Sequence, residues 1–352
     1  MTPALFAIPG DLRTLTGGYG YDRRMLAALP ACGVAATHLP LPGGFPFPDA
    51  ATVAESLRLL GEAPPDHVLL VDGLALGALP PDALAGLAAP LVALVHHPLG
   101  LESGLASATA RALIENERAV LAHVRHVIVT SQTTRDTLIA DFAVSAERIT
   151  VAEPGTDPAL RFRGSGGQGV ALLAIGSITP RKGHGVLVEA LAGLAHLPWS
   201  LTLIGSPDRD PACAAQLRAS LAAHGLHERI TLGGEALEEA LGAAYAGADL
   251  FVLPSLYEGY GMVLGEAMAR GLPIVTTTGG AAAQTVPDAA ALKVPPGDIL
   301  ALREALQTAI TDPALRARLS DASWLAGQGL PRWSDGAALI ARVLHSIAGA
   351  KP

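Results

Sequence analysis

The stretch PSLYEGYGMVLGEAMARGLP at residues 254–273 lies between two apolar runs that are typical of β-strands. The run before it, DLFVL at 249–253, is short, and the run after it, IVTTT at 274–278, is rich in β-branched residues. The second half of the stretch itself has the composition of a helix. The order strand, loop, helix, strand predicts one unit of an α/β domain with a parallel sheet.

The loop and helix within this stretch are suited to hold an anion. Gly259 and Gly261 let the backbone turn tightly and approach a ligand, and the helix expected over 262–270 ends at a glycine. A helix N-terminus offers backbone amides and a positive dipole end, which favour a phosphate. Two carboxylates, Glu258 and Glu266, flank that position.

Length and composition indicate two domains and exclude several classes of partner. A chain of 352 residues is longer than one hydrophobic core usually grows. The net charge of −8 argues against a general nucleic-acid binder and allows at most peripheral contact with an anionic membrane. Cys32 and Cys213 are too few for a disulfide framework, and we find neither a signal peptide nor a membrane span. We expect a cytoplasmic protein, with any membrane contact at the inner face.

Apolar strands alternate with amphipathic helices along the whole chain, which predicts parallel sheets covered on both faces. Ligands of such sheets bind beyond the carboxyl ends of the strands. His96 and His97 directly follow the apolar strand LVALV at 91–95 and therefore lie at such an end. They are either structural or functional, and their position favours a functional role.

The segment RGSGGQG at 163–169 is the most linker-like part of the chain and predicts a domain boundary. We expect an N-terminal domain over 1–162, a C-terminal domain over 163–326 and a final helical segment over 327–352. The final segment is amphipathic, and its sequence alone does not tell which domain it packs on.

Two features of the first half leave alternatives open. Gly17 and Gly18 open a helix without the spacing of the dinucleotide fingerprint, so they form either a plain turn or a loop that approaches a ligand. Three arginines spaced by seven lie on one face of a helix over 106–124. That face could touch an anionic lipid or a phosphorylated acceptor, but the interspersed Glu115 and Glu117 favour a solvated face.

Arg181 and Lys182 lie in the loop ITPRKGH, after the first strand of the second half. Only three lysines occur in the whole chain, and one of them stands here beside an arginine. This pair favours a phosphate clamp over a solvated surface. We expect no metal, because no Asp-x-Asp pair or His/Cys cluster is present.

Together these motifs resemble glycosyltransferase family four, the retaining, nucleotide-sugar-dependent enzymes of the GT-B fold. The resemblance is most specific at the Glu-x7-Glu motif from Glu258 to Glu266, and it extends through GSITPRKGH, VPPGD and SQTTRDTL. It implies two Rossmann-like, doubly wound parallel-sheet domains that face a cleft. The donor would bind to the C-terminal domain and the acceptor to the N-terminal one, and the last helix would cross back to the first domain.

The resemblance also implies roles for individual residues. Glu258 would lie beside the donor sugar, Glu266 would hold the ribose hydroxyls, and His96 would touch the donor sugar, with His97 as the alternative. Arg181 and Lys182 would neutralise the diphosphate, and the loop of Gly17 and Gly18 would approach it. The sugar and phosphate oxygens would be met by the backbone of Gly259, Tyr260, Gly261 and Met262.

Three positions depart from the family pattern. Ser177 stands where an arginine is usual, Gln284 where a glutamate is usual, and Glu153 where an asparagine is common. None of them lies in the Glu-x7-Glu motif, but each could shift donor preference or rate.

The resemblance implies transfer of a hexose, mannose first, to a hydroxyl of a glycan or lipid-linked acceptor in cell-surface polysaccharide or glycolipid synthesis. The donor would be GDP-mannose or a UDP-hexose, and no cofactor or metal is expected. Two other classes remain open on the same architecture: a sugar-nucleotide epimerase or phosphorylase, and a non-catalytic sugar-binding protein.

Overall fold

The computed structural model describes residues 1–162 and 164–349 and divides the chain into two compact units. The first unit runs from Met1 to Gly155 and includes the end of the chain from Pro331, and the second runs from Thr156 to Leu330. Arg163, the first residue of the expected linker, and residues 350–352 of the expected final segment lie outside the described residues.

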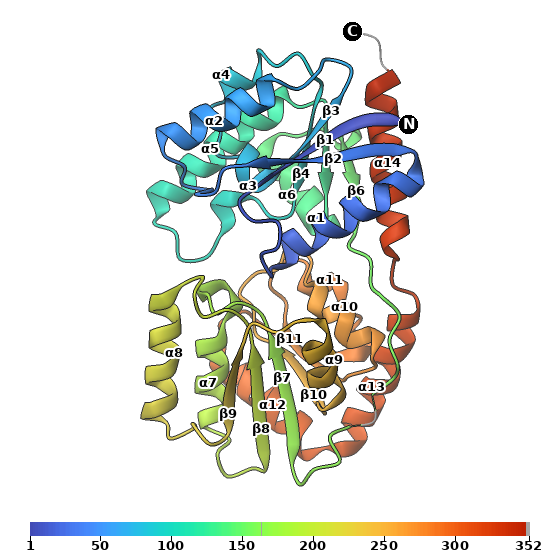
Figure 1. Cartoon of the computed structure of the whole chain (residues 1–352). Helices are drawn as coiled ribbons and strands as arrows, with labels where there is room; N and C mark the ends of the chain where they lie inside the picture. The colour runs from blue at the N-terminus through green and yellow to red at the C-terminus, as the bar shows by residue number, and fades with distance from the viewer. Residues whose placement is uncertain (163, 350–352) are drawn as a thin grey trace. The chain divides into compact units, whose positions relative to one another are not determined.

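The first unit is built on a six-stranded parallel sheet with helices on its faces (Figure 1). The strand order is β2-β1-β3-β4-β5-β6. The strands are β1 (Thr2–Pro9), β2 (Val34–Leu41), β3 (Val68–Asp72), β4 (Leu91–Val95), β5 (His126–Val129) and β6 (Ile149–Val151). The helices are α1 (Gly17–Ala28), α2 (Ala50–Gly61), α3 (Gly73–Leu76), α4 (Pro81–Leu84), α5 (Ser107–His123), α6 (Gln132–Phe142) and α14 (Trp333–Gly349), with the 3-10 turns η1 (Leu29–Cys32), η2 (Leu99–Leu101) and η3 (Ala146–Arg148).

The second unit repeats this plan with the strand order β12-β11-β10-β7-β8-β9, again all parallel. Its strands are β7 (Val170–Ile175), β8 (Trp199–Ile204), β9 (Ile230–Gly234), β10 (Leu250–Leu253), β11 (Ile274–Thr277) and β12 (Ala291–Val294). Its helices are α7 (His184–Ala192), α8 (Pro211–Ala223), α9 (Glu238–Ala246), α10 (Met262–Ala269), α11 (Ala282–Thr285), α12 (Ile299–Thr311) and α13 (Pro313–Gln328), with the 3-10 turns η4 (Pro180–Lys182) and η5 (Asp288–Ala290).

The two α/β sheets predicted from the alternating pattern are confirmed. Every residue of β3, β4 and β10 is buried, as expected for strands covered on both faces. In the second unit, separate hydrophobic clusters lie on the two sides of the sheet: one includes side chains of α7, α8 and α12, and the other those of α9, α10 and α11. Short polar side chains cap several helices, including Ser131 at the start of α6, whose hydroxyl accepts the Thr134 N–H.

One strand is not apparent from the sequence. The segment around 40–50 is rich in proline and glycine, which predicts no regular element, but β2 extends to Leu41 and includes Pro40. β2 lies at the edge of the sheet, where a residue without an N–H is tolerated because one side of the strand has no partner.

The domain division differs from the expected boundaries. It falls after Gly155 and after Leu330, not at 162/163 and 326/327. Residues 156–162 belong to the second unit because Phe162 donates its N–H to the Arg270 carbonyl at 2.9 Å and packs on the hydrophobic cluster of α10. The glycine-rich segment is likewise tied to the second unit, since the Ser165 N–H donates to Asp249 at 2.7 Å.

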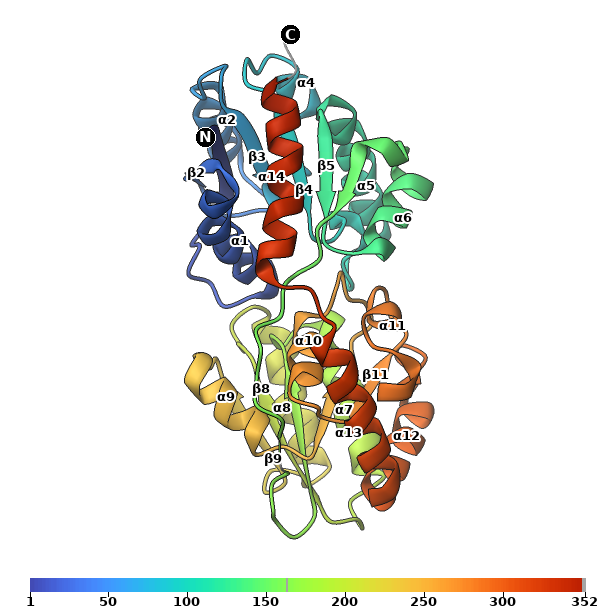
Figure 2. The same cartoon turned by 90° about the vertical axis from the view of Figure 1, so that its right-hand side faces the viewer.

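Helix α14 packs on the first unit although it follows the second in the chain (Figure 2). It contacts α1 and η1 and lies against the sheet. His345 connects it to both ends of the first βα unit: Nδ1 lies 2.7 Å from Thr2 Oγ1, and Nε2 lies 3.1 Å from the Cys32 carbonyl oxygen. No described helix is both long enough and apolar enough to cross a membrane.

Helix α5 corrects one expectation about surface charge. Arg111, Arg118 and Glu115 are exposed, but Glu117 is buried instead of sharing their solvated face. Its position follows from helix geometry, because Leu113 and Leu121 lie four residues away on either side and face the core. Glu117 Oε2 accepts the Leu99 N–H at 3.0 Å, and burial raises the pKa of its carboxyl to about 8.

Replacing Glu117 with glutamine should stabilise the protein at alkaline pH. The carboxyl is protonated in the folded protein up to about pH 8 but ionises in the unfolded chain near its ordinary pKa of 4.5. The unfolded state therefore loses its proton first, and the free energy of unfolding falls by about 1.4 kcal/mol for each pH unit between these two values. Thermal melts from pH 5 to pH 9 should show a flatter profile for Glu117→Gln, which keeps an acceptor for Leu99. Parallel profiles for the two proteins would contradict this account.

The backbones at the ends of β7 and β8 approach too closely for a side chain, so Gly205→Ala should destabilise the protein. A Cβ at Gly205 would lie 1.9 Å from the Gly176 carbonyl oxygen. Overpacking of this kind costs about 1–3 kcal/mol, which a denaturant titration measures. Gly242→Ala is the matched control, because it lies inside α9 with no atom within 4 Å of the new Cβ. It should stabilise by up to about 1 kcal/mol through helix propensity. Equal effects of the two substitutions would refute the steric explanation.

Candidate functional site

The candidate site of the second unit forms where the strand order of its sheet reverses. β7 and β10 are neighbours in the sheet, and the chain leaves them toward opposite edges. At such a reversal the loops after the two strands separate and leave room for a ligand. The loop after β7 carries η4, and the loop after β10 is 254–261. The two loops are in contact, since the Leu256 N–H donates to the Arg181 carbonyl at 2.7 Å.

A glycine makes this contact possible. Gly183 ends η4 with φ of +66°, and a Cβ there would lie 2.1 Å from the Pro254 carbonyl oxygen. The position therefore needs glycine both for its left-handed conformation and for the close approach of the second loop. This approach brings the side chains of η4 next to those of the loop after β10.

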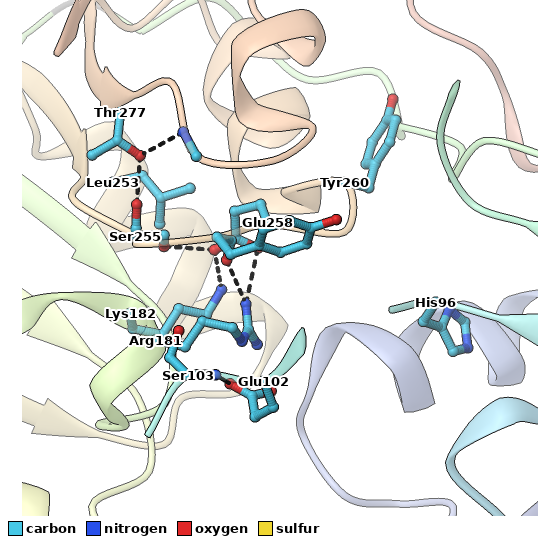
Figure 3. A network of polar contacts seen from close by, with 12 residues as sticks. His96, Glu102, Ser103, Arg181, Lys182, Leu253, Ser255, Glu258, Tyr260 and Thr277 are labelled. Atoms are coloured by element: carbon cyan, nitrogen blue, oxygen red, sulfur yellow. Dashed lines mark hydrogen bonds and ion pairs between the residues drawn. The ribbon is translucent and has the colours of Figure 1, made fainter. Parts of the chain in front are cut away.

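Glu258 is the centre of a buried polar network that joins the two loops (Figure 3). Lys182 Nζ donates to Glu258 Oε1 at 2.6 Å, and Ser255 Oγ donates to the same oxygen at 2.6 Å. Arg181 Nη1 lies 3.5 Å from Glu258 Oε2 and donates to the Tyr257 carbonyl at 2.9 Å. We call Glu258, Arg181, Lys182 and Ser255 the Glu258 clasp.

The clasp keeps Glu258 ionised although its side chain is only 6% exposed. Burial acts to raise the pKa of the carboxyl, but Lys182 and Arg181 more than offset it and hold the pKa below its usual value. The family resemblance assigns Glu258 to a sugar and the two cations to a diphosphate. The structure brings these three side chains into contact with one another.

His184 is the first residue of α7 and lies near Lys182 and Glu258 of the clasp. It is buried, its Nε2 lies 3.1 Å from the Gly176 carbonyl oxygen, and burial lowers its pKa to about 4. It is therefore neutral near pH 7. The positive charge at this end of the sheet comes from Arg181 and Lys182, partly balanced by Glu258.

Helix α10 begins beside the clasp. Gly261 is its N-cap with φ of +88°, and no side chain caps the first turn. The backbone from Gly259 to Met262, including the buried Tyr260, thus leads into a helix end suited to an anion. The Tyr260 carbonyl is fixed by the Thr285 hydroxyl at 2.7 Å.

Glu266 lies one turn further along α10 and is half-buried. Its Oε2 accepts the hydroxyl hydrogen of Tyr245 from α9 at 2.8 Å, and burial together with Glu266 raises the pKa of Tyr245 well above its usual value. Arg270 lies over the Tyr245 ring at 4.4 Å from its centre. Tyr245 therefore fixes the orientation of the carboxylate.

In the first unit, the glycines and the histidine singled out from the sequence lie next to each other. Gly17 and Gly18 are the first residues of α1, and a Cβ at Gly18 would lie 3.5 Å from His96 Cδ2. His96 follows β4, and its Nε2 lies 3.1 Å from Asp22 Oδ1 and 3.8 Å from Asp72 Oδ2.

Asp22, Asp72 and His96 are the one group among the described residues whose ligand atoms lie close enough to hold a metal ion, within 4.8 Å of one another. His97, the alternative named from the sequence, is half-buried and is not part of this group.

Four polar residues at these positions were not singled out from the sequence. Asp72 and Ser255 lie at the carboxyl ends of strands, so the rule that identified His96 could have identified them too. Asp22 and Tyr245 lie inside helices with no motif around them, and only the packing of neighbouring elements shows their partners.

The three departures from the family pattern lie at different depths. Ser177 is half-buried after β7, and Gln284 is exposed in α11. Glu153 is half-buried after β6, and burial raises the pKa of its carboxyl.

Both halves of the chain match known protein-family models. Residues 19–160 match the model described as Glycosyltransferase Family 4, and residues 169–312 match Glycosyl transferases group 1. Among similar proteins, the MMP alpha-(1->4)-mannosyltransferase of Mycolicibacterium hassiacum is 29% identical over 68% of this chain and 61% of its own length. The mannosylfructose-phosphate synthase of Agrobacterium fabrum is 30% identical over 47% of this chain and 40% of its own length. The matches thus span less than two thirds of these relatives.

Solved structures share the fold over the whole chain. Sucrose-phosphate synthase from Thermosynechococcus elongatus has a TM-score of 0.82 at 21% identity and covers 100% of both chains. Anabaena HepE in complex with UDP and glucose has a TM-score of 0.77 at 19% identity, covering 98% of this chain and 100% of its own. At these identities the likeness shows the fold alone, and that fold is the expected GT-B arrangement of two parallel-sheet units. Since the two family models match successive halves and together span most of the sequence, the chain belongs to glycosyltransferase family four.

Proposed function

We propose that the protein is a retaining hexosyltransferase that moves a sugar from a nucleotide diphosphate sugar to an acceptor hydroxyl on a glycan or lipid-linked substrate. Mannose is the first candidate for this sugar. The Glu258 clasp carries this proposal, because it places two cations and an uncapped helix end at the reversal point of one sheet. Two relatives support mannose by their names, whereas HepE has been solved with UDP-glucose. GDP-mannose is therefore the first donor to test and a UDP-hexose the second.

The clasp suits the leaving group of such a reaction. As the bond between sugar and diphosphate breaks, negative charge grows on the phosphate oxygens. Arg181, Lys182 and the first amides of α10 are donors held in place beforehand, so they stabilise the transition state more than the ground state. A guanidinium carries five N–H donors and an ammonium three, so each cation can hold Glu258 and a phosphate oxygen together. No step of this scheme requires a metal ion.

Glu258 has a different part in this scheme. It stays ionised in its buried position and accepts from Lys182 and Ser255 through one oxygen. We assign it to orienting the cations and the donor sugar rather than to attack on the sugar. Retention would then follow from attack of the acceptor on the face that the diphosphate leaves, with the departing phosphate taking the proton of the acceptor hydroxyl.

Truncating the clasp should slow transfer while an equally conservative change elsewhere does not. Lys182→Ala should lower kcat/KM about a hundredfold, equivalent to about 3 kcal/mol of lost stabilisation of the leaving group. Glu258→Gln keeps the size of the side chain but removes the charge that holds both cations, and should also slow transfer. The assay follows radiolabelled sugar from GDP-mannose or UDP-glucose into a lipid and glycan extract.

Lys293→Ala is the matched control for these variants. Lys293 on β12 pairs with the exposed Asp288 of η5, so its loss should leave transfer near the parent rate. Parent-like transfer by Lys182→Ala and Glu258→Gln would show that the site is wrongly assigned. Loss of transfer by all three variants would indicate general damage to the unit instead.

A nucleoside diphosphate that binds the clasp should stabilise the folded protein. At a concentration one hundred times its Kd the gain is about 2.7 kcal/mol, which raises the melting temperature. Comparing GDP, UDP and ADP identifies the preferred base. Lys182→Ala should lose the larger part of the shift, whereas Lys293→Ala should keep it. A shift that survives Lys182→Ala unchanged would place the diphosphate elsewhere.

A further inference from the structure

The first unit contains a pair of aspartates that no part of the proposed reaction uses. Asp22 on α1 is 0% exposed, and Asp72 at the end of β3 is 4% exposed. Both approach Nε2 of His96, Asp22 Oδ1 at 3.1 Å and Asp72 Oδ2 at 3.8 Å. Two buried acids and one partly exposed imidazole are thus packed together at the ends of β3 and β4.

The two carboxyl groups cannot both be ionised in such a place. Burial raises the pKa of Asp72 well above its usual value, and the neighbouring charge of Asp22 raises it further. Asp22 Oδ1 is the oxygen nearer to His96 Nε2, at 3.1 Å against 3.8 Å for Asp72 Oδ2, so the proton that the pair keeps lies on Asp72. The orphaned oxygen of the pair agrees with this, because Asp22 Oδ2 is buried without a hydrogen-bond donor among the described residues. A proton on Asp72, hydrogen-bonded to Asp22, provides the pair with a donor of its own.

The remaining negative charge then lies beside His96. Burial acts to lower the pKa of the imidazole, but Asp22, and to a smaller extent Asp72, raise it above its usual value. The ring is also fixed sterically, since Gly18 lies against its Cδ2–Nε2 edge and Tyr21 meets it edge-on with centroids 5.2 Å apart. Nδ1 lies on the other edge of the ring, away from Gly18 and the aspartates.

A bound cation would be the other explanation of this cluster. Asp72 Oδ1 already accepts the Leu74 N–H at 2.6 Å, and a protonated carboxyl is a weak ligand. The three side chains can instead hydrogen-bond to one another, Asp72 to Asp22 and Asp22 to His96. The hydrogen-bonded arrangement gives each of the three side chains a partner without an ion.

We propose that Asp22 and Asp72 share one proton and that the ionised Asp22 is the positioning residue of His96, holding its Nε2–H so that Nδ1 is presented to the sugar substrate. The part that concerns the sugar rests on the proposed transferase function. The arrangement of the proton and the ring does not depend on it.

The charged and titratable groups that face His96 come from three elements. Asp22 and Tyr21 lie on α1, Asp72 ends β3, and His38 on β2 lies close enough to be influenced by Asp22. Burial lowers the pKa of His38 and raises that of Tyr21 far beyond neutrality, so neither supplies a charge near pH 7. Asp22 is the group that raises the pKa of His96 most.

Nuclear magnetic resonance on histidine-labelled protein tests this directly, with His96→Gln to assign the signal. In the parent protein, neutral His96 should carry its proton on Nε2, and a proton on Nδ1 would overturn the proposal. Asp22→Asn should lower the pKa of His96 by about one unit or more, because burial then acts without an opposing charge. Asp72→Asn should change it little, because an amide replaces a carboxyl that is already neutral.

The outcomes separate the possible arrangements. Equal effects of the two variants, or a larger effect of Asp72→Asn, would show that the charge does not lie on Asp22 and would refute the assignment. Glu189→Gln, beside the exposed His224 in the second unit, should leave the His96 titration unchanged. Melting curves of each variant show whether it folds, and the tautomer in the parent protein is decisive even if one does not.

Kinetics then test the link to transfer. Asp22→Asn should lower kcat about tenfold to a hundredfold, with the limb of the pH–rate profile that reports His96 moved to lower pH. An unchanged profile would confine Asp22 to a structural role. Absence of transfer from every nucleotide sugar by the parent protein would refute the proposed function and leave the result on the tautomer standing.

Discussion

Burial of parallel strands on both faces is the constraint on which this structure depends. Before their last residue, β3, β4 and β10 carry apolar side chains alone, because every position in these strands is buried. Polar groups are therefore moved to the points where the strands end. Asp72 and His96 lie at such ends in the first unit, and Ser255 and Glu258 follow the end of β10 in the second. The apolar core thus concentrates polar and ionisable side chains at the carboxyl ends of the strands of each sheet.

The two units balance their buried charges by opposite means. In the second unit Glu258 is surrounded by two cations and remains ionised, because the attraction exceeds the cost of burial. In the described part of the first unit no arginine or lysine takes part in the contacts of Asp22 and Asp72, and the second negative charge is avoided by protonation. The strand ends of the second unit therefore carry a net positive charge, and those of the first unit carry a histidine that lies beside two acids.

Much of the fold, and the strand ends at which the candidate site residues lie, could be predicted from the sequence. The alternation of apolar strands with helices is a local signal, and so are the glycines around Met262 and the pair Arg181–Lys182. The order of the strands is not local, and it is this order that brings β7 beside β10 and Lys182 onto Glu258. Glu117 and Tyr245 show the same limit, because the role of each depends on which neighbour its helix face meets. The strand β2 was not predicted because it contains Pro40, which this strand tolerates at the edge of the sheet.

The ionised Glu258 also bears on how a product would leave. With Arg181 and Lys182 positive, Glu258 negative and His184 neutral, the clasp has a net charge of only +1. A free nucleoside diphosphate carries more negative charge than this and is not fully neutralised there. If the clasp holds the diphosphate as proposed, affinity for the spent nucleotide would be limited, while the cations would stay positioned for the next donor. The glutamate would then help set the rate of turnover as well as the geometry of binding.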